Sequence, residues 1–268
     1  MKKFWKRIVL YTCLLYVVLC GDAVFFADSL IFQPHRSSYR DSDDIIKVTT
    51  SSGKKISAIY LPNELARYTL LVSHGNAEDL GDIREWLDEL HGAGFSIFAY
   101  DYEGYGTSEG KPGEKASYED ESAAYDFLAV KIGTPPDRII VFGRSVGTGP
   151  AVQLATRRPV AALVLQSPFL SAFRVLTRVP LFPFDRFPNY QRIRHVHCPV
   201  LIMHGTADSV IGFWHGEKLF QLANDPKQFV AVQGADHNDV SPGTTRVYTE
   251  ALAGFAGTLD AQAGRERP

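Results

Sequence analysis

Apolar and polar positions divide the chain into an N-terminal segment and a domain. Four basic residues lie among the first seven, and residues 8–20 then carry no charge. From Tyr68 onward, short apolar runs alternate with longer amphipathic segments. Buried parallel strands give uninterrupted apolar runs, whereas the helices that connect them need only one apolar face. The alternation therefore predicts an α/β domain over residues 29–259, with a mostly parallel, doubly wound sheet.

The same pattern predicts the individual elements. Two strands at 45–50 and 55–61 flank a Ser51-Ser52-Gly53 turn, which indicates a β-hairpin at an antiparallel N-terminal edge. Further strands are predicted at 69–73, 96–101, 139–142, 162–166, 200–204 and 228–232. Helices are predicted at 82–91, 117–131, 149–156, 214–223 and 244–258. The acidic run Glu119-Asp120-Glu121 is expected at the solvated start of the second helix, and residues 260–268 are expected to form a disordered tail.

The uncharged N-terminal run predicts a membrane anchor or signal segment over residues 1–28. Its length is at the lower limit for a span even when Val24 to Phe26 are counted, and Gly21 and Asp22 interrupt it. By the positive-inside rule, the preceding basic residues place the N-terminus in the cytoplasm and the domain on the extracytoplasmic side. A lipoprotein signal cleaved before Cys20 is the alternative, although Leu19 is large for the position before such a cut.

Composition and charge narrow the choice of partners. The net charge is -2 without a basic stripe, so we expect no nucleic-acid partner. Only Cys198 lies in the domain, while Cys13 and Cys20 lie in the N-terminal run, so no disulfide framework is expected. His195, His197 and Cys198 lack a second pair of zinc ligands. We therefore expect no metal and no cofactor.

Candidate chemistry begins at Gly143-Arg144-Ser145-Val146-Gly147, which directly follows an apolar strand. A Gly-x-Ser-x-Gly turn between strand and helix holds the serine hydroxyl above the carboxyl end of the sheet. Asp208 and His237 follow two later strands, and the carboxyl ends of parallel strands meet at one edge. A serine needs a base to take its proton, and the base needs an acid to orient it. We expect Ser145, His237 and Asp208 to form a catalytic triad.

Two loops are expected to complete the site. The strand at 69–73 runs into His74-Gly75-Asn76, so the backbone N–H groups of Asn76 and Val146 are the candidate oxyanion hole, with His74 bracing the loop. Residues 168–188 carry five phenylalanines and connect two strands at the height of the site. These aromatic residues either pack over the sheet edge or form an apolar wall for an acyl chain, with Phe182 and Phe184 as candidate substrate-binding residues. The connection is long enough for a small cap at most.

In combination, these motifs resemble the α/β-hydrolase superfamily, and most closely the branch that contains eukaryotic membrane-associated protein depalmitoylases. The resemblance rests on His74-Gly75-Asn76-Ala77, residues 100–106, residues 143–148, Ser167-Pro168, His204-Gly205-Thr206 and His237-Asn238-Asp239. It implies the α/β-hydrolase fold and assigns the triad to Ser145, Asp208 and His237. Two departures stand out. Asp236 occupies a position where relatives usually have Gly, and a hydrophobic segment replaces their cysteine-rich N-terminus, so their protein substrates cannot be transferred to this chain.

From these observations we expect a serine hydrolase that cleaves carboxylic ester or thioester bonds through an acyl-enzyme on Ser145. A medium or longer acyl chain is the expected substrate, because the domain is held near a membrane and the 168–188 connection is aromatic. Two alternatives remain open. One is a serine peptidase of the same fold, and the other is a non-catalytic, membrane-tethered binding protein.

Overall fold

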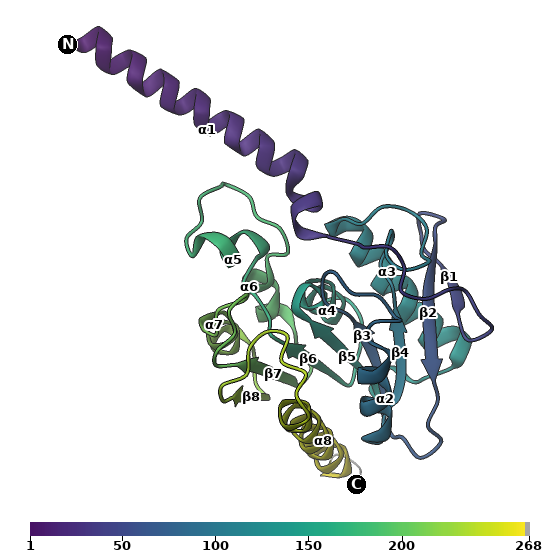
Figure 1. The fold of residues 1–268 in the computed structure, drawn as a ribbon. Coiled ribbons are helices and arrows are strands. Elements are labelled where there is room, and N and C mark those ends of the chain that lie inside the picture. Colours follow the sequence, from purple (N-terminus) through teal and green to yellow (C-terminus); the bar gives the residue numbers. More distant parts are fainter. Residues whose placement is uncertain (266–268) are drawn as a thin grey trace.

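An eight-stranded sheet lies at the centre of the computed structural model, which describes residues 1–265 (Figure 1). The strands are β1 (Ile46–Thr49), β2 (Lys55–Leu61), β3 (Thr69–Ser73), β4 (Ser96–Tyr100), β5 (Ile139–Arg144), β6 (Ala162–Gln166), β7 (Val200–Gly205) and β8 (Lys227–Val232). Their order is β1-β2-β4-β3-β5-β6-β7-β8. β2 pairs antiparallel with β1 and with β4, and all other pairs are parallel. The predicted α/β fold with an antiparallel N-terminal edge is confirmed.

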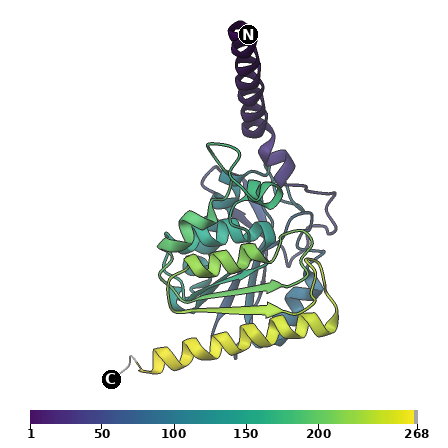
Figure 2. The same ribbon diagram turned by 90° about the vertical axis from the view of Figure 1, so that its left-hand side faces the viewer.

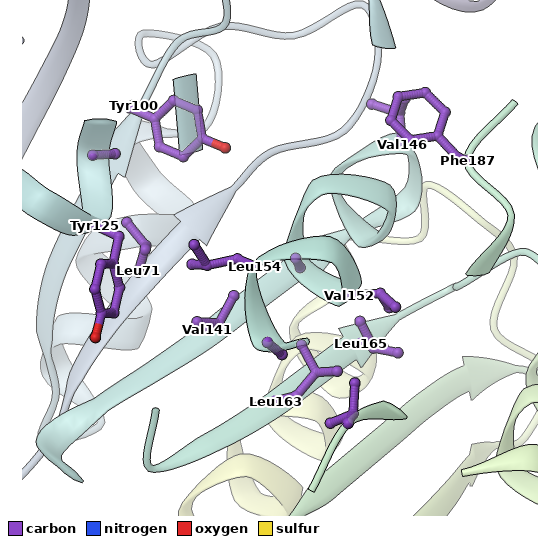
Figure 3. Packing of buried hydrophobic residues seen from close by; sticks show 14 of the residues in the cluster. Leu71, Tyr100, Tyr125, Val141, Val146, Val152, Leu154, Leu163, Leu165 and Phe187 are labelled. Atoms are coloured by element: carbon purple, nitrogen blue, oxygen red, sulfur yellow. The ribbon is translucent and has the colours of Figure 1, made fainter. Parts of the chain in front are cut away.

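The buried strands send alternate side chains into two separate cores, which is why their sequences are apolar throughout. In β5, Ile139 and Val141 join the core shown in Figure 3, whereas Ile140 and Phe142 join the core on the opposite face. The main helices of the domain are α2 (Arg84–Gly92), α3 (Glu114–Asp126), α4 (Thr148–Ala155), α5 (Ala172–Thr177), α6 (Asn189–Arg192), α7 (Trp214–Leu222) and α8 (Pro242–Arg265). α3, α4 and α7 cover the first face, and α2 and α8 cover the second (Figure 2).

The acidic run in α3 is the first correction to the predicted elements. α3 begins at Glu114, directly after Gly113, and not at residue 117. Asp120 and Glu121 therefore lie inside the helix and are buried, rather than at a solvated start. Glu121 accepts a hydrogen bond of 2.9 Å from the Ser73 hydroxyl at the end of β3, which satisfies one of its two carboxyl oxygens.

The C-terminal helix is the second correction. α8 continues to Arg265, so residues 260–265 are helical and not a disordered tail, and residues 266–268 lie outside the described residues. Leu259 is buried, and Asp260 forms an ion pair of 2.9 Å with Arg67 and accepts a 2.8 Å hydrogen bond from the Tyr68 hydroxyl. These contacts hold the end of α8 against the beginning of β3.

The N-terminal segment forms one continuous helix, α1 (Lys2–Ile31), which projects from the domain (Figures 1 and 2). By length and composition, α1 is able to cross a membrane, and its large apolar side chains are mostly exposed. Gly21 and Asp22 do not interrupt it, because the backbone hydrogen bonds of a helix are local and tolerate both residues. Ala27 is buried, and α1 continues to Ile31, three residues past the expected boundary at residue 28.

Candidate active site

Ser145 lies at the sharp turn between β5 and α4, where its backbone adopts φ = 52°. Such a left-handed conformation costs a non-glycine residue about 1–3 kcal/mol and is characteristic of functional turns. The turn packs tightly on the end of β3, because a Cβ atom at Gly147 would lie only 2.1 Å from the Ser73 carbonyl oxygen. The local sequence therefore fixes the position of the Ser145 hydroxyl relative to the loop that follows β3.

The structure brings Ser145, His237 and Asp208 together from three different strand ends. His237 Nδ1 lies 2.8 Å from Asp208 Oδ2, and His237 Nε2 lies 3.0 Å from Ser145 Oγ. Since a carboxylate only accepts, Nδ1 carries the proton toward Asp208 and leaves Nε2 free to accept from the serine hydroxyl. This is the hydrogen-bonding arrangement in which an imidazole can act as a general base toward serine.

Asp208 is buried and held by several donors. Its Oδ1 accepts backbone N–H bonds from Val210 at 3.0 Å and Ile211 at 2.7 Å. Burial alone would raise the pKa of Asp208, but hydrogen bonds from His204 and His237 outweigh burial and hold the pKa well below its usual range. Asp208 is thus a carboxylate at neutral pH, as the base requires.

His204 is a contributor to this site that sequence reasoning did not identify. Its Nε2 lies 3.2 Å from Asp208 Oδ2 and 2.8 Å from the Ile211 carbonyl oxygen, so a proton on Nε2 serves both acceptors. The side chain is fully buried at the end of β7. The His204-Gly205-Thr206 motif formed part of the resemblance, but nothing in the sequence indicated that its imidazole would face the Asp208 carboxylate.

Asp236 connects two loops of the site through hydrogen bonds to backbone N–H groups. Its Oδ1 accepts backbone N–H bonds of 2.7 Å from Ser209 and 2.7 Å from His237. The exposed carboxylate therefore ties the loop that carries His237 to the loop that carries Asp208. This departure from the usual glycine stabilises the geometry of the site without touching the imidazole ring.

The loop after β3 is braced from both sides. His74 is fully buried, with Nδ1 2.7 Å from the Gly75 carbonyl oxygen and Nε2 3.3 Å from Asp101 Oδ1. Burial by itself lowers the pKa of His74, but the hydrogen bond to Asp101 and its charge outweigh burial and raise it above its ordinary value. Glu78 accepts a 2.6 Å hydrogen bond from the Gly75 N–H and pairs with Arg144 at 3.2 Å, which links the loop to the serine turn.

Asn76 and Val146, the two expected oxyanion donors, both line the cleft at Ser145. The Asn76 side chain has a role that the sequence did not reveal. Its Oδ1 accepts hydrogen bonds from the Gln33 N–H at 2.9 Å and the Tyr105 hydroxyl at 2.6 Å. These bonds connect the loop to the segment that follows α1, so the N-terminal helix is joined directly to the site.

A large apolar cleft of about 610 Å³ begins at Ser145. α1 forms one side, and α5 with the loop after it forms the other. The lining residues are Leu19, Asp22, Ala23, Phe26, Ala27, Leu30, Ile31, Gln33, Asn76, Ser145, Val146, Phe169, Ala172, Phe173, Val175, Leu176, Thr177, Phe182, Val210 and Ile211. Phe182 is thus on the wall, whereas Phe184 is not among these residues and stacks on Phe182 with ring centroids 5.7 Å apart.

A smaller recess of about 160 Å³ meets the cleft at Asn76, Ser145 and Val210. Its other lining residues are Gly75, Glu78, Arg144, His237 and Asn238. The two cavities therefore differ in character. The apolar cleft and the polar recess approach the same serine hydroxyl, and a bond to be broken there would have an apolar group on one side and a polar group on the other.

Comparisons with known proteins identify relatives of the chain. A family model described as serine aminopeptidase, S33, matches residues 65–182. Alpha/beta hydrolase domain-containing protein 17B of Homo sapiens is 42% identical over 212 residues, which cover 77% of this chain and 73% of the relative. The Caenorhabditis elegans alpha/beta hydrolase domain-containing protein aho-3 is 43% identical over 201 residues, covering 73% of this chain and 58% of the relative.

Solved structures show the same fold. The esterase Pf2001 of Pyrococcus furiosus has a TM-score of 0.70 at 16% sequence identity, over 85% of this chain and 98% of that one. The esterase domain of a Rhodothermus marinus protein has a TM-score of 0.63 at 21% identity, over 79% of this chain and 96% of that one. Fold, motifs and relatives thus lead to one conclusion: the chain is a hydrolase of the α/β-hydrolase superfamily and belongs to the family of the alpha/beta hydrolase domain-containing 17 proteins.

Proposed function

We propose that the protein is a serine hydrolase that cleaves carboxylic ester or thioester bonds of medium or longer acyl chains through an acyl-enzyme on Ser145. The observation that carries this proposal is the hydrogen-bonded series Ser145, His237 and Asp208 at the junction of an apolar cleft and a polar recess. A nucleophile, a base and an orienting acid in hydrogen-bond contact are the requirements for acyl transfer.

In the acylation step, Ser145 Oγ attacks the acyl carbon while its proton passes to His237 Nε2. The Asn76 and Val146 N–H groups stabilise the negative charge that develops on the acyl oxygen. Asp208 stabilises the imidazolium. The tetrahedral intermediate then collapses, the carbon–oxygen or carbon–sulfur bond breaks, and the leaving group takes the proton from His237.

Deacylation repeats these steps with water. His237 Nε2 accepts a proton from the water molecule, whose oxygen attacks the acyl carbon, and the same two N–H groups hold the second oxyanion. The bond to Ser145 Oγ breaks, the serine recovers its proton from His237, and the fatty acid leaves. The overall reaction consumes one water and regenerates the free enzyme.

The two cavities support the substrate class. Each buried methylene contributes about 0.8 kcal/mol, so a few carbons of acyl chain in the apolar cleft change affinity tenfold or more. The polar recess beside Arg144 and Glu78 suits the leaving group, an alcohol or a thiol on a polar carrier. Phe182 would contact the acyl chain, and Phe184 would stack on Phe182 outside the cleft.

A serine peptidase of the same fold is the second candidate, because the matching family model is described as an aminopeptidase. The cleft favours the first candidate, since Asp22 is the one charged side chain among the residues that line it. Comparing turnover of aminoacyl p-nitroanilides with that of p-nitrophenyl octanoate separates the two. Faster peptide-type turnover would favour the peptidase.

We also propose that α1 keeps the protein at a membrane, with its basic N-terminus in the cytoplasm and the domain on the other side. Lys2, Lys3, Lys6 and Arg7 precede the apolar part of α1, and Asp22 and Asp28 follow it. Protease digestion of sealed cells or vesicles tests this orientation. A lipoprotein is the alternative, and it would begin at a modified Cys20 in N-terminal mass spectrometry.

The hydrolase proposal is tested with a fluorophosphonate probe and a series of p-nitrophenyl esters. We expect the wild type to be labelled and Ser145→Ala to remain unlabelled, because the probe reacts only with an activated serine. We expect kcat/KM to rise from acetate to octanoate and palmitate presented in micelles. An unlabelled, folded wild type would support the non-catalytic binding protein, and a steady fall in kcat/KM with chain length would reject the acyl cleft.

A further inference from the structure

One face of α1 forms a wall of the apolar cleft. Leu19, Ala23, Phe26 and Leu30 are spaced by four, three and four residues, so they lie in one row along the helix and all line the cleft. Their neighbours Val18 and Phe25 point elsewhere, are exposed and do not line it. The same helix that is long and apolar enough for a membrane thus contributes to the candidate substrate site.

The facing wall carries an exposed apolar tip, formed by residues 176–181 at the end of α5 and in the loop after it. Leu176 is 88% exposed, Val179 is 55% exposed and Leu181 is 53% exposed. The tip is held beside α1, because the Tyr16 hydroxyl donates a 2.9 Å hydrogen bond to the Leu181 carbonyl oxygen. Figure 1 shows this loop reaching toward α1 on the same side of the domain. Exposed apolar surface that continues along a membrane helix indicates contact with lipid.

The position of the charged residues along α1 indicates how deep the apolar tip lies in a membrane. Asp22 is the first charged residue after the apolar run, so it marks the polar boundary of a membrane that contains α1. Tyr16 lies six residues nearer the N-terminus, which is about 9 Å deeper at 1.5 Å per residue. Because Leu181 accepts a hydrogen bond from Tyr16, the tip reaches about 5–10 Å into the membrane, which is the usual insertion depth of interfacial apolar segments.

We propose that the acyl chain of the substrate enters the cleft sideways from the bilayer, between α1 and residues 172–182, and that Ala23 and Phe26 of α1 determine chain length. The inference rests on the proposed function, because the cleft ends at Ser145. At its other end, the cleft reaches Leu19, beyond Asp22 on the membrane side. A lipid-anchored acyl group can therefore reach the serine along a wall that is mostly apolar, with Asp22 as its one charged residue.

The first experiment uses the full-length protein in detergent micelles and measures the ratio of kcat/KM for p-nitrophenyl palmitate to that for the acetate. Ala23→Trp fills the cleft, so we expect the ratio to fall by about tenfold. Phe26→Ala removes part of the wall and is also expected to lower the ratio. This second variant keeps the inference testable if Ala23→Trp does not fold. Val18→Trp and Phe25→Ala, on the other faces of α1, are the matched controls and should leave the ratio unchanged.

The second experiment tests entry from the bilayer with a palmitoyl ester embedded in phosphatidylcholine vesicles that also contain the protein. Val179→Asp places a charge on the inserted tip without altering the cleft lining, and we expect the rate to fall by about tenfold. Val130→Asp is the control: it lies after α3, is 75% exposed and does not line the cleft, so the substitution should have no effect.

The outcomes separate this inference from the proposed function. An unlabelled, inactive wild type would overturn both. A labelled, active wild type whose chain-length ratio is the same in Ala23→Trp and Phe26→Ala would overturn the role of α1 alone. An unchanged vesicle rate in Val179→Asp would overturn entry from the bilayer.

Discussion

Replacing Asp208 by Asn tests the proposed mechanism at a point where structure and chemistry can be separated. Asp208 Oδ1 accepts the N–H groups of Val210 and Ile211, and an Asn oxygen accepts both equally well. Asp208 Oδ2 faces His237 Nδ1 at 2.8 Å and His204 Nε2 at 3.2 Å. The Asn NH₂ group placed there is a donor, so the two backbone N–H bonds of the loop are retained while the contacts with His237 and His204 are inverted.

The effect of this inversion on kcat can be predicted. Facing a donor, His237 must leave Nδ1 unprotonated and carry its proton on Nε2, where it can no longer accept the Ser145 proton. Loss of the correct tautomer in a triad lowers kcat by about 10⁴, which corresponds to about 5.5 kcal/mol of transition-state stabilisation. The free energy of unfolding should change far less, because the backbone contacts of Oδ1 are preserved.

The assay compares kcat for p-nitrophenyl octanoate in the wild type, Asp208→Asn and Asp236→Asn, with urea unfolding as the measure of stability. Asp236→Asn removes an equally negative group from the residue that precedes His237, on the neighbouring loop, but retains the acceptor for the Ser209 and His237 N–H groups. We expect its kcat to stay within about threefold of the wild type, since the charge is exposed and screened. A loss below tenfold in a folded Asp208→Asn variant would refute the assigned role of Asp208.

Three further predictions concern the scaffold. Gly147→Ala places a Cβ 2.1 Å from the Ser73 carbonyl oxygen, so urea unfolding should show a loss of about 1–3 kcal/mol, and unchanged stability would contradict the close packing. Burial raises the pKa of Glu121 well above 4.5, so its contribution to stability is complete below pH 4.5 and declines as the pH rises. Glu121→Gln should therefore gain stability relative to the wild type between pH 5 and pH 8, and a pH-independent difference would contradict this. Full-length protein should remain with membranes after a carbonate wash while a chain beginning at Ser29 is soluble, and soluble full-length protein with an intact Met1 would contradict the anchor.

Much of the fold was predictable because each buried strand is a short, uninterrupted apolar run. The serine turn was predictable for a related reason, since the two glycines of Gly143-Arg144-Ser145-Val146-Gly147 are a local signal of strand and helix in close contact. The placement of Asp208 and His237 followed from the rule that parallel strands gather their carboxyl ends.

The features that sequence reasoning missed depend on contacts between distant segments. The run Glu119-Asp120-Glu121 has the composition of a solvated helix start, and the burial of Glu121 depends on how α3 packs against the end of β3, where Glu121 meets Ser73. The wall formed by α1 was hidden for a similar reason. The row from Leu19 to Leu30 is visible as helical spacing, but a membrane helix is apolar on every face, so the pattern could not indicate which face meets the cleft.

The central claim, that Ser145 carries the acyl group, is tested most directly by trapping the intermediate. The wild type is mixed with excess p-nitrophenyl octanoate, quenched with acid during the first turnovers, digested and analysed by mass spectrometry. The account predicts one octanoyl group per chain, on the peptide that contains Ser145, and none in Ser145→Ala. An octanoyl group on a different residue, or continued turnover by Ser145→Ala at the wild-type rate, would contradict it.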